Sequence, residues 1–263
     1  HATLRGPLKR KQEIEAHVTV PRLTLDYRNT IHLAAAQPIR VDYAKGVLNL
    51  LPASIRGTGT ELTMQARVPM DRSAPASLLL RGGVDLRLAQ LINPDITSGG
   101  QLQFDIDSFG SRTDPNVQGH IRIVNASFAT ADVPLGLQQG NGVLTLTQNR
   151  LNIDQFGAKM GGGNVTASGG VEYRPNLRFD VAMTAQNARV LYAQSVRTTL
   201  GSKLALTGNL DNALLQGQVE IDQISFTEDF DMTEFMSQFG DDSTPPPTQG
   251  FSQNLRLQIG IAT

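Results

Sequence analysis

The feature that most constrains this chain is a period of two in its hydrophobic residues. Residues 102–107 read Leu-Gln-Phe-Asp-Ile-Asp, and residues 179–184 read Phe-Asp-Val-Ala-Met-Thr. Successive side chains of a β-strand point to opposite faces, so each such run predicts a strand with one apolar and one polar face. Gly, Asn, Asp and Pro separate the runs, as turns require. The pattern predicts an all-β chain with little helix.

Two stretches depart from the alternation. In residues 84–92, the leucines at 86, 88 and 91 could line one side of a helix. In residues 228–239, apolar residues recur about three or four positions apart, which favours a short helix but also fits a loop. Residues 240–250 contain three consecutive prolines, which cannot hold a strand ladder or a helix. We therefore expect a short helix or loop with a Pro-rich linker after residue 226.

A long-period repeat indicates how the sheet grows. Residues 117–123 (VQGHIRI) are echoed by residues 215–221 (LQGQVEI), whose glycines lie 98 positions apart (217 − 119). A β-helix repeats about every 20 to 25 residues, so this spacing indicates a module of several strands. Strands of about five to eight residues, stacked about 4.8 Å apart, would number roughly 20. An open sheet of that length must twist and curl, which predicts an elongated antiparallel sheet curled into an open apolar gutter.

Composition excludes several classes of function. The 23 basic and 24 acidic residues leave a net charge of −1, which argues against nucleic acid as a partner. The chain has no cysteine, and its four histidines form no metal-ligand spacing, so no metal or cofactor site is expected. The glycines at 161–163 lack the Lys-Ser/Thr ending of a phosphate loop and are typical of a bulge or tight turn. We expect no enzymatic activity.

The order of motifs between residues 98 and 226 resembles the TamB family, within the AsmA-like group. The matching pieces are SGG at 98–100 with QLQF at 101–104, DPNVQG at 114–119, IVNASF at 123–128, GNGVL at 140–144, LNI at 151–153 and GGGNVTASG at 161–169. No single motif is specific, so the resemblance rests on their order and spacing. It implies an open β-taco sheet.

The resemblance also implies a location and a function. It implies a periplasmic protein whose inner-membrane anchor lies outside this sequence. It further implies bridge-like transport of phospholipid between the inner and outer membranes, with acyl chains held in a hydrophobic groove. An alternative associated with the same family is a scaffold that assembles outer-membrane β-barrel proteins by β-augmentation. The implied partner of the full-length protein is an outer-membrane barrel protein of the Omp85/TamA type.

We divide the chain into four segments. Residues 1–97 form a β-rich repeat segment, and residues 98–226 form the TamB-like multi-strand repeats. Residues 227–250 form the short helix or loop with its linker, and residues 251–263 form a further strand. Apolar alternation still runs at residues 255–261, which indicates an internal piece of a longer protein.

Candidate ligand contacts are the apolar residues that share one parity within each strand. A closed sandwich core would explain the same alternation, but such cores favour large aromatic residues, and only 5% of this chain is aromatic. The predicted lining of the lipid groove is Phe104, Ile121, Ile123, Leu144, Leu146, Phe179, Val181, Leu204, Leu206, Val219 and Ile221. We expect these side chains on one face, and neighbours such as Arg122 and Ala205 on the other.

Overall fold

The computed structural model describes residues 1–7, 13–27, 31–130, 135–192, 196–226 and 254–263. Of these residues, 76% lie in strands and 4% in helix, and the 17 strands belong to one open sheet. The predicted all-β open sheet with little helix is confirmed. The helix or loop predicted at residues 228–239, and the linker that follows it, lie outside the described residues.

The chain divides into two compact units. Unit 1 comprises His1–Ala126 and Val143–Asn149, and unit 2 comprises Ser127–Gly142 and Arg150–Thr263. Strands β10 (Pro115–Ala129) and β11 (Leu137–Leu146) contribute residues to both units.

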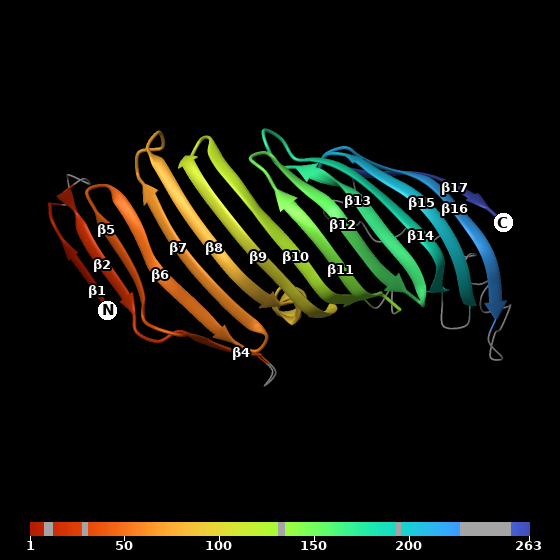
Figure 1. Ribbon diagram of the computed structural model, residues 1–263, viewed down its shortest axis with the longest axis horizontal. Coiled ribbons are helices and arrows are strands. Elements are labelled where there is room, and N and C mark those ends of the chain that lie inside the picture. Colours follow the sequence, from red (N-terminus) through yellow and green to blue (C-terminus); the bar gives the residue numbers. More distant parts are fainter. Residues whose placement is uncertain (8–12, 28–30, 131–134, 193–195, 227–253) are drawn as a thin grey trace, which may run out of the picture. The chain divides into compact units, whose positions relative to one another are not determined.

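Unit 1 contains nine further strands (Figure 1). They are β1 (Ala2–Arg5), β2 (Glu15–Val20), β3 (Thr24–Tyr27), β4 (Ile31–Ala35), β5 (Ile39–Ala44), β6 (Val47–Gly57), β7 (Thr60–Pro69), β8 (Pro75–Asp85) and β9 (Thr97–Ser111). Their pairing order is β1–β2–β5–β6–β7–β8–β9, and β4 joins both β3 and β6. Every one of these pairs is antiparallel.

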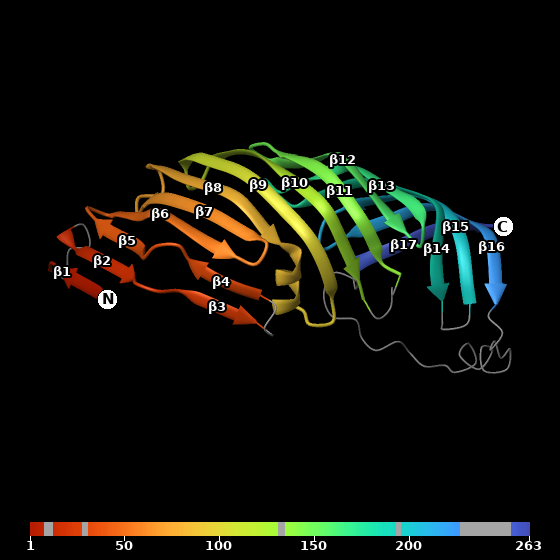
Figure 2. The same cartoon turned by 60° about the horizontal axis from the view of Figure 1, so that its bottom comes forward.

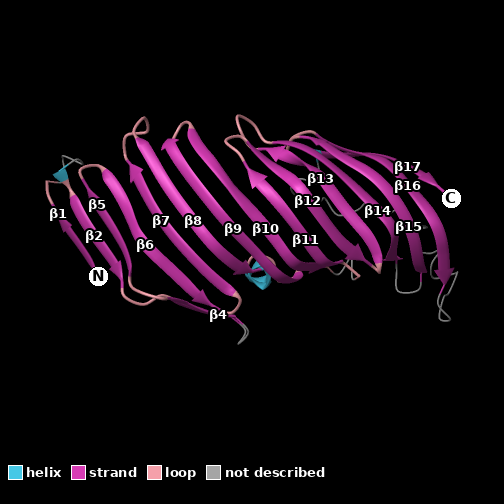
Figure 3. Ribbon diagram, viewed as in Figure 1, coloured by secondary structure: helices cyan, strands magenta, loops and turns pink. Residues whose placement is uncertain are grey.

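Unit 2 contains six further strands, which follow one another in sequence and in space (Figure 3). They are β12 (Arg150–Met160), β13 (Gly163–Glu172), β14 (Arg178–Tyr192), β15 (Val196–Gly208), β16 (Ala213–Phe226) and β17 (Leu255–Ala262). The pairs are antiparallel except β16–β17, which is parallel. Gly161 and Gly162 form the β12–β13 turn with φ of 54° and 91°, as their predicted role in a tight turn requires.

Many strands are longer than the five to eight residues expected from the sequence. Strands β9, β10 and β14 each have 15 residues. Register shifts, which mark β-bulges, interrupt the pairing after Leu50, Ile153 and Ala185, and again between β15 and β16. A bulge inserts one residue without ending the strand, so the chain continues through it with a local bend.

The helix predicted within residues 84–92 is shorter than expected. Val84 and Asp85 end strand β8, and a 3₁₀ helix, η2, covers Leu86–Leu91. Asp85 caps this helix, because its carboxylate accepts hydrogen bonds from the backbone N–H of Arg87 at 2.9 Å and from its guanidinium. The Asp85 N–H donates to Thr60 at 3.1 Å, and Ser98 donates to the Leu86 carbonyl at 2.9 Å.

Thr60, Asp85 and Ser98 are the three buried polar residues of the described chain. All three therefore lie around the start of η2. Their hydrogen bonds satisfy the buried polar groups there and hold η2 in a single geometry.

The repeat seen in the sequence has a structural counterpart in each unit. Gly119 lies in β10 and Gly217 in β16, and a Cβ there would lie 2.2 Å from the carbonyl oxygen of Asp105 and 2.0 Å from that of Lys203. Asp105 and Lys203 are themselves 98 positions apart (203 − 105). Both glycines thus permit the same close approach of a strand to the strand before it.

Replacing Gly217 by Ala should destabilise the chain by about 2 to 4 kcal/mol, because φ is 146° there and the Cβ meets a backbone oxygen. Gly260 is the matched control, since a Cβ there meets nothing closer than 3.8 Å. Urea unfolding of both variants gives the free energies of unfolding. Equal losses for Gly217→Ala and Gly260→Ala would show that the close approach is unimportant.

The hydrogen bonds of Asp85 at the start of η2 should make the stability of the fold depend on pH. Hydrogen bonds from Arg87 hold the pKa of Asp85 below its ordinary value of 3.8. A lowered folded-state pKa contributes stability above 3.8 that is lost as pH falls through the lower folded value. Asp85→Asn should therefore cost about 1.5 to 3 kcal/mol of unfolding free energy at neutral pH, and the deficit should shrink in acid.

Asp95→Asn is the control for this effect, because Asp95 is an exposed residue that follows the same helix. Urea unfolding of both variants over a range of pH provides the measurement. A deficit for Asp85→Asn that is constant from neutral pH to well below 3.8 would contradict the assigned role.

Candidate functional site: the apolar face of the sheet

The strand register of unit 2 aligns apolar side chains into rows, since residues paired across strands point to the same face. Val181 pairs with Gly169 on one side and Leu206 on the other, and Leu206 pairs with Leu215. Leu215 pairs in turn with Leu257 of β17. One row of side chains therefore crosses five strands without a polar residue.

Neighbouring rows repeat this composition. The side chains on this face of unit 2 are Leu151, Ile153, Phe156, Ala158, Met160, Val165, Ala167, Val171, Phe179, Val181, Met183, Ala185, Ala188, Val190, Val196, Thr198, Leu200, Ser202, Leu204, Leu206, Ala213, Leu215, Val219, Ile221, Ile224, Phe226, Leu255, Leu257, Ile259 and Ile261. We call this surface the apolar face of unit 2. Only Ser202 and Thr198 among these residues carry a hydroxyl.

Unit 1 has an apolar face of its own. Met64 pairs with Ala53 and Leu80, and Leu80 pairs with Ile106. The residues that share this face are Ala2, Leu4, Ala16, Val18, Val20, Leu25, Ile31, Leu33, Ala35, Ile39, Val41, Tyr43, Leu48, Leu50, Ala53, Ile55, Leu62, Met64, Ala66, Val68, Ala76, Leu78, Leu80, Val84, Leu102, Phe104, Ile106 and Ser108.

The opposite face of each unit carries most of the polar side chains, and in unit 1 it also carries Phe109, which is 65% exposed. In unit 1, cross-strand ion pairs join Arg56 to Glu61 at 2.9 Å and Arg81 to Asp105 at 2.9 Å. In unit 2, Arg150 reaches Glu172 at 3.3 Å. The groups of the two pairs in unit 1 are exposed to water, so each pair adds only about 0.2 to 1 kcal/mol, whereas Arg150 and Glu172 are half-buried. All three pairs place charges on this face, which keeps it hydrated.

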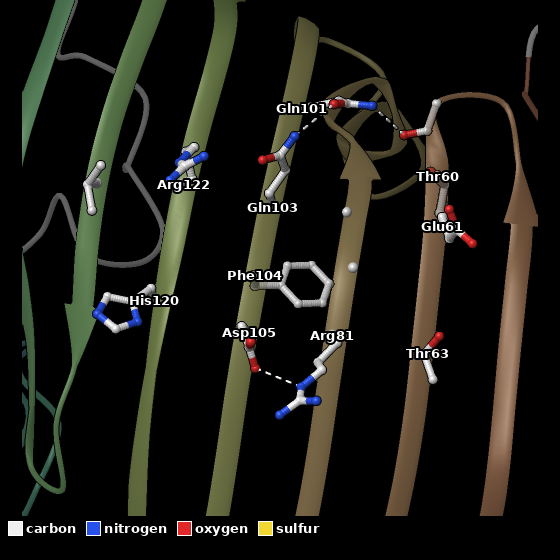
Figure 4. Close-up of a pocket in the computed structure, with 14 residues that line it drawn as sticks. Thr60, Glu61, Thr63, Arg81, Gln101, Gln103, Phe104, Asp105, His120 and Arg122 are labelled. Atoms are coloured by element: carbon white, nitrogen blue, oxygen red, sulfur yellow. Dashed lines mark hydrogen bonds and ion pairs between the residues drawn. The ribbon is translucent and has the colours of Figure 1, made fainter.

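Hollows on the polar face lie where side chains are small or missing. Figure 4 shows the one in unit 1, with a volume of about 690 Å³. It surrounds Gly83, which pairs with Glu61 and Gln103 and contributes no side chain between them. Two hollows of about 670 and 510 Å³ in unit 2 lie at Gly260 and Gly201 in the same way. We interpret these hollows as gaps between the hydrated polar side chains of this face.

The apolar faces are uncovered in the described part of each unit. The elements in contact are strands close to one another in the sheet, together with η2 against β9, so no second layer packs on these faces. The buried hydrophobic residues there are Ile31, Ala53, Ala158, Ala188, Val196 and Ala213, of which four are alanines. Leu257 and Ile261 of β17 stay 66% and 71% exposed. Val181, Leu206 and Leu215, farther inside the sheet, are half-buried. Apolar surface that stays exposed over several strands is typical of interaction sites.

The structure places the predicted lining residues in both units. Phe179, Val181, Leu204, Leu206, Val219 and Ile221 share the apolar face of unit 2. By its pairing with Gly82, Phe104 belongs to the apolar face of unit 1, but it also lines the hollow shown in Figure 4. Ile121 and Ile123 are half-buried on either side of exposed Arg122 in β10. Leu144 and Leu146 are half-buried in β11, and Leu146 borders a hollow together with Asp107 and Gln118. Lipid contact at all of these positions stays a prediction.

Other residues of the apolar faces were missing from the predicted set. Residues 61–68 read Glu-Leu-Thr-Met-Gln-Ala-Arg-Val, so plain alternation could have identified Leu62 and Met64. Ile224 is different, because a bulge moves the apolar parity of β16 from odd to even positions. Its signal is an apolar pattern that shifts by one residue within a single run.

The described residues contain neither a cluster of metal ligands nor a membrane-spanning helix. No three histidine, aspartate or glutamate side chains there come together as metal ligands would. None of the described helices is both long enough and apolar enough to cross a membrane.

Comparison with known proteins gives one match. Residues 154–234 match the family model of the TamB C-terminal domain. This range begins in β12 and includes strands β13 to β16, which carry most of the apolar face of unit 2. No curated protein matches the chain, and no solved structure matches it.

Proposed function

We propose that this chain, which contains a TamB-family segment at residues 154–234, carries phospholipid between the inner and outer membranes. The family is a translocation and assembly module of the periplasm and cell envelope. In this proposal, the apolar faces bind acyl chains and the headgroups stay in water. The sheet acts as a binding surface and performs no chemical step.

One observation supports this proposal above the others: register-aligned rows of aliphatic side chains, uncovered in the described part of each unit, run across successive strands. Moving a lipid chain into water costs about 0.8 kcal/mol per methylene group, which makes spontaneous exchange of a two-chain lipid slow. An apolar surface that continues from strand to strand removes most of that cost. A chain can move along such a surface from strand to strand without entering water.

The polar face supports the same proposal from the other side. Its ion pairs keep one surface of each unit hydrated while the other surface is free to hold lipid. The alternative, assembly of outer-membrane barrel proteins by β-augmentation, uses strand edges rather than the apolar face. The two functions therefore differ in what the apolar face contacts.

A photo-crosslinking amino acid at Leu206 should capture phospholipid, whereas one at Ala205 should not. Leu206 lies on the apolar face with Val181 and Leu215, and Ala205 pairs with Ala182 and Gln216 on the polar face. Mass spectrometry of the chain purified from membranes identifies the adduct. Equal lipid capture at both positions would refute the proposal, and protein adducts at Leu206 in place of lipid would favour the assembly function.

Leu206→Asp should reduce lipid transfer about tenfold or more while the chain stays folded. A carboxylate on an uncovered face can still reach water, but it interrupts the apolar path. Transfer of fluorescent phospholipid between vesicles measures the effect, and circular dichroism reports the strand content. Ala205→Asp is the matched control and should transfer lipid normally. If Leu206→Asp instead unfolds the chain, Leu206 belongs to a closed core and the proposal is wrong.

A further inference from the structure

Three turns of unit 1 lie side by side at one edge of the sheet. They are residues 45–46 between β5 and β6, residues 70–74 between β7 and β8, and residues 112–114 between β9 and β10, along the top of Figure 1. The Met70 N–H donates to the Gly46 carbonyl at 2.7 Å, and the Arg112 N–H donates to the Arg72 carbonyl at 3.2 Å. These bonds join the turns into one continuous edge, which we call the turn edge of unit 1. Figure 2 shows the same strands from a second direction.

Each of the three turns carries one exposed basic residue: Lys45, Arg72 or Arg112. None of them forms an ion pair with another residue that the structure describes. The acidic residue of the middle turn, Asp71, accepts hydrogen bonds from the Ser73 N–H at 2.9 Å and from its hydroxyl at 2.7 Å. The turn edge therefore presents three positive charges that no described carboxylate contacts.

The turns at the opposite edge of the same strands differ. In the β6–β7 hairpin, Arg56 pairs with Glu61 at 2.9 Å, and between β8 and β9, Arg87 pairs with Asp85. Each of these cations has a carboxylate beside it, which weakens its attraction for an anion from outside. Between β5 and β9, the cations at the turns are thus neutralised at one edge of the sheet and available at the other.

The backbone of Lys45 supports a role for its charge. Lys45 and Gly46 have φ of 50° and 73°, so both central residues of this two-residue turn have positive φ. Asparagine, aspartate or glycine is the usual first residue of such a turn, because positive φ is unfavourable for most other side chains. Turn chemistry does not account for a lysine at this position, whereas a requirement for a cation does.

The apolar face of unit 1 reaches the turn edge. Tyr43 pairs with Leu48, and Leu48 pairs with Val68, which lies two residues before the turn at 70–74. Met70, the first residue of that turn, is 48% exposed. An acyl chain that lies along β6 or β7 on the apolar face can therefore end with its headgroup beside a turn of this edge.

We infer that the turn edge of unit 1 binds the phosphate of the carried phospholipid through Lys45, Arg72 and Arg112, while the acyl chains lie along the strands. This inference rests on the proposed function and adds an orientation for the lipid. Ammonium and guanidinium groups donate charge-assisted hydrogen bonds to phosphate. Successive turns are two strands apart, about 10 Å, so a headgroup that leaves one cation meets the next while its chains stay on the apolar face.

The test measures which lipid the full chain takes from vesicles that contain phosphatidylglycerol and a diacylglycerol with the same acyl chains. Mass spectrometry of the chain, separated from the vesicles, gives the ratio of the two bound lipids relative to their ratio in the vesicles. The unchanged chain should favour the phospholipid about tenfold, because only this lipid carries a phosphate. The triple variant Lys45→Gln/Arg72→Gln/Arg112→Gln should bring the ratio close to one.

The matched control is Arg22→Gln/Arg40→Gln/Arg122→Gln, which removes the same charge from exposed residues outside the turn edge. This control should keep the tenfold preference, and circular dichroism checks that both variants are folded. If the first triple variant does not fold, Arg72→Gln alone decides, because it removes no described side-chain contact. That single variant should lower the preference about twofold to threefold.

A ratio near one in the unchanged chain, or an undiminished ratio in the folded turn-edge variant, would overturn the inference and leave the proposed function standing. Absence of both lipids from the unchanged chain would overturn both. Sedimentation with phosphatidylglycerol vesicles distinguishes the carried lipid from a membrane surface. A turn-edge variant that loses attachment to vesicles but keeps the tenfold ratio of bound lipids would show that this edge contacts a bilayer, and the inference would be wrong.

Discussion

The backbone hydrogen bonds between neighbouring strands are the constraint on which the rest of this structure depends. They set the register, and the register decides which side chains share a face. A slip of one residue between β14 and β15 would move Leu206 away from Val181 and toward the polar face. Each apolar face is therefore a product of pairing between strands as much as of hydrophobic content.

The same constraint explains how the described part of each unit can be stable without a layer packed on its apolar face. Each apolar side chain contacts its neighbours along the row, and cross-strand contacts of this kind contribute about 0.2 to 1 kcal/mol each. Backbone N–H and C=O groups are satisfied by the hydrogen bonds between neighbouring strands. The cost is an uncovered apolar surface, which ordinary soluble domains avoid and which a binding surface requires.

Glycines and bulges then shape this surface locally. Gly119 and Gly217 let one strand approach the one before it, in different units but at equivalent places in the repeat. The bulges near Ala188 and Ile221 bend strands of unit 2 locally without ending them. Conformational freedom at a few positions therefore sets the geometry, while the aliphatic residues provide the contact surface.

The sequence alone determined the all-β class, the two-faced strands and the parity of residues such as Phe179 and Val181, because alternation is a local property of an extended chain. Tertiary structure decided where parity changes, as at Ile224, and how far strands run past a bulge. It also decided that the apolar faces are uncovered in the described part of each unit. These outcomes depend on hydrogen bonds between segments far apart in the chain, which no local pattern encodes.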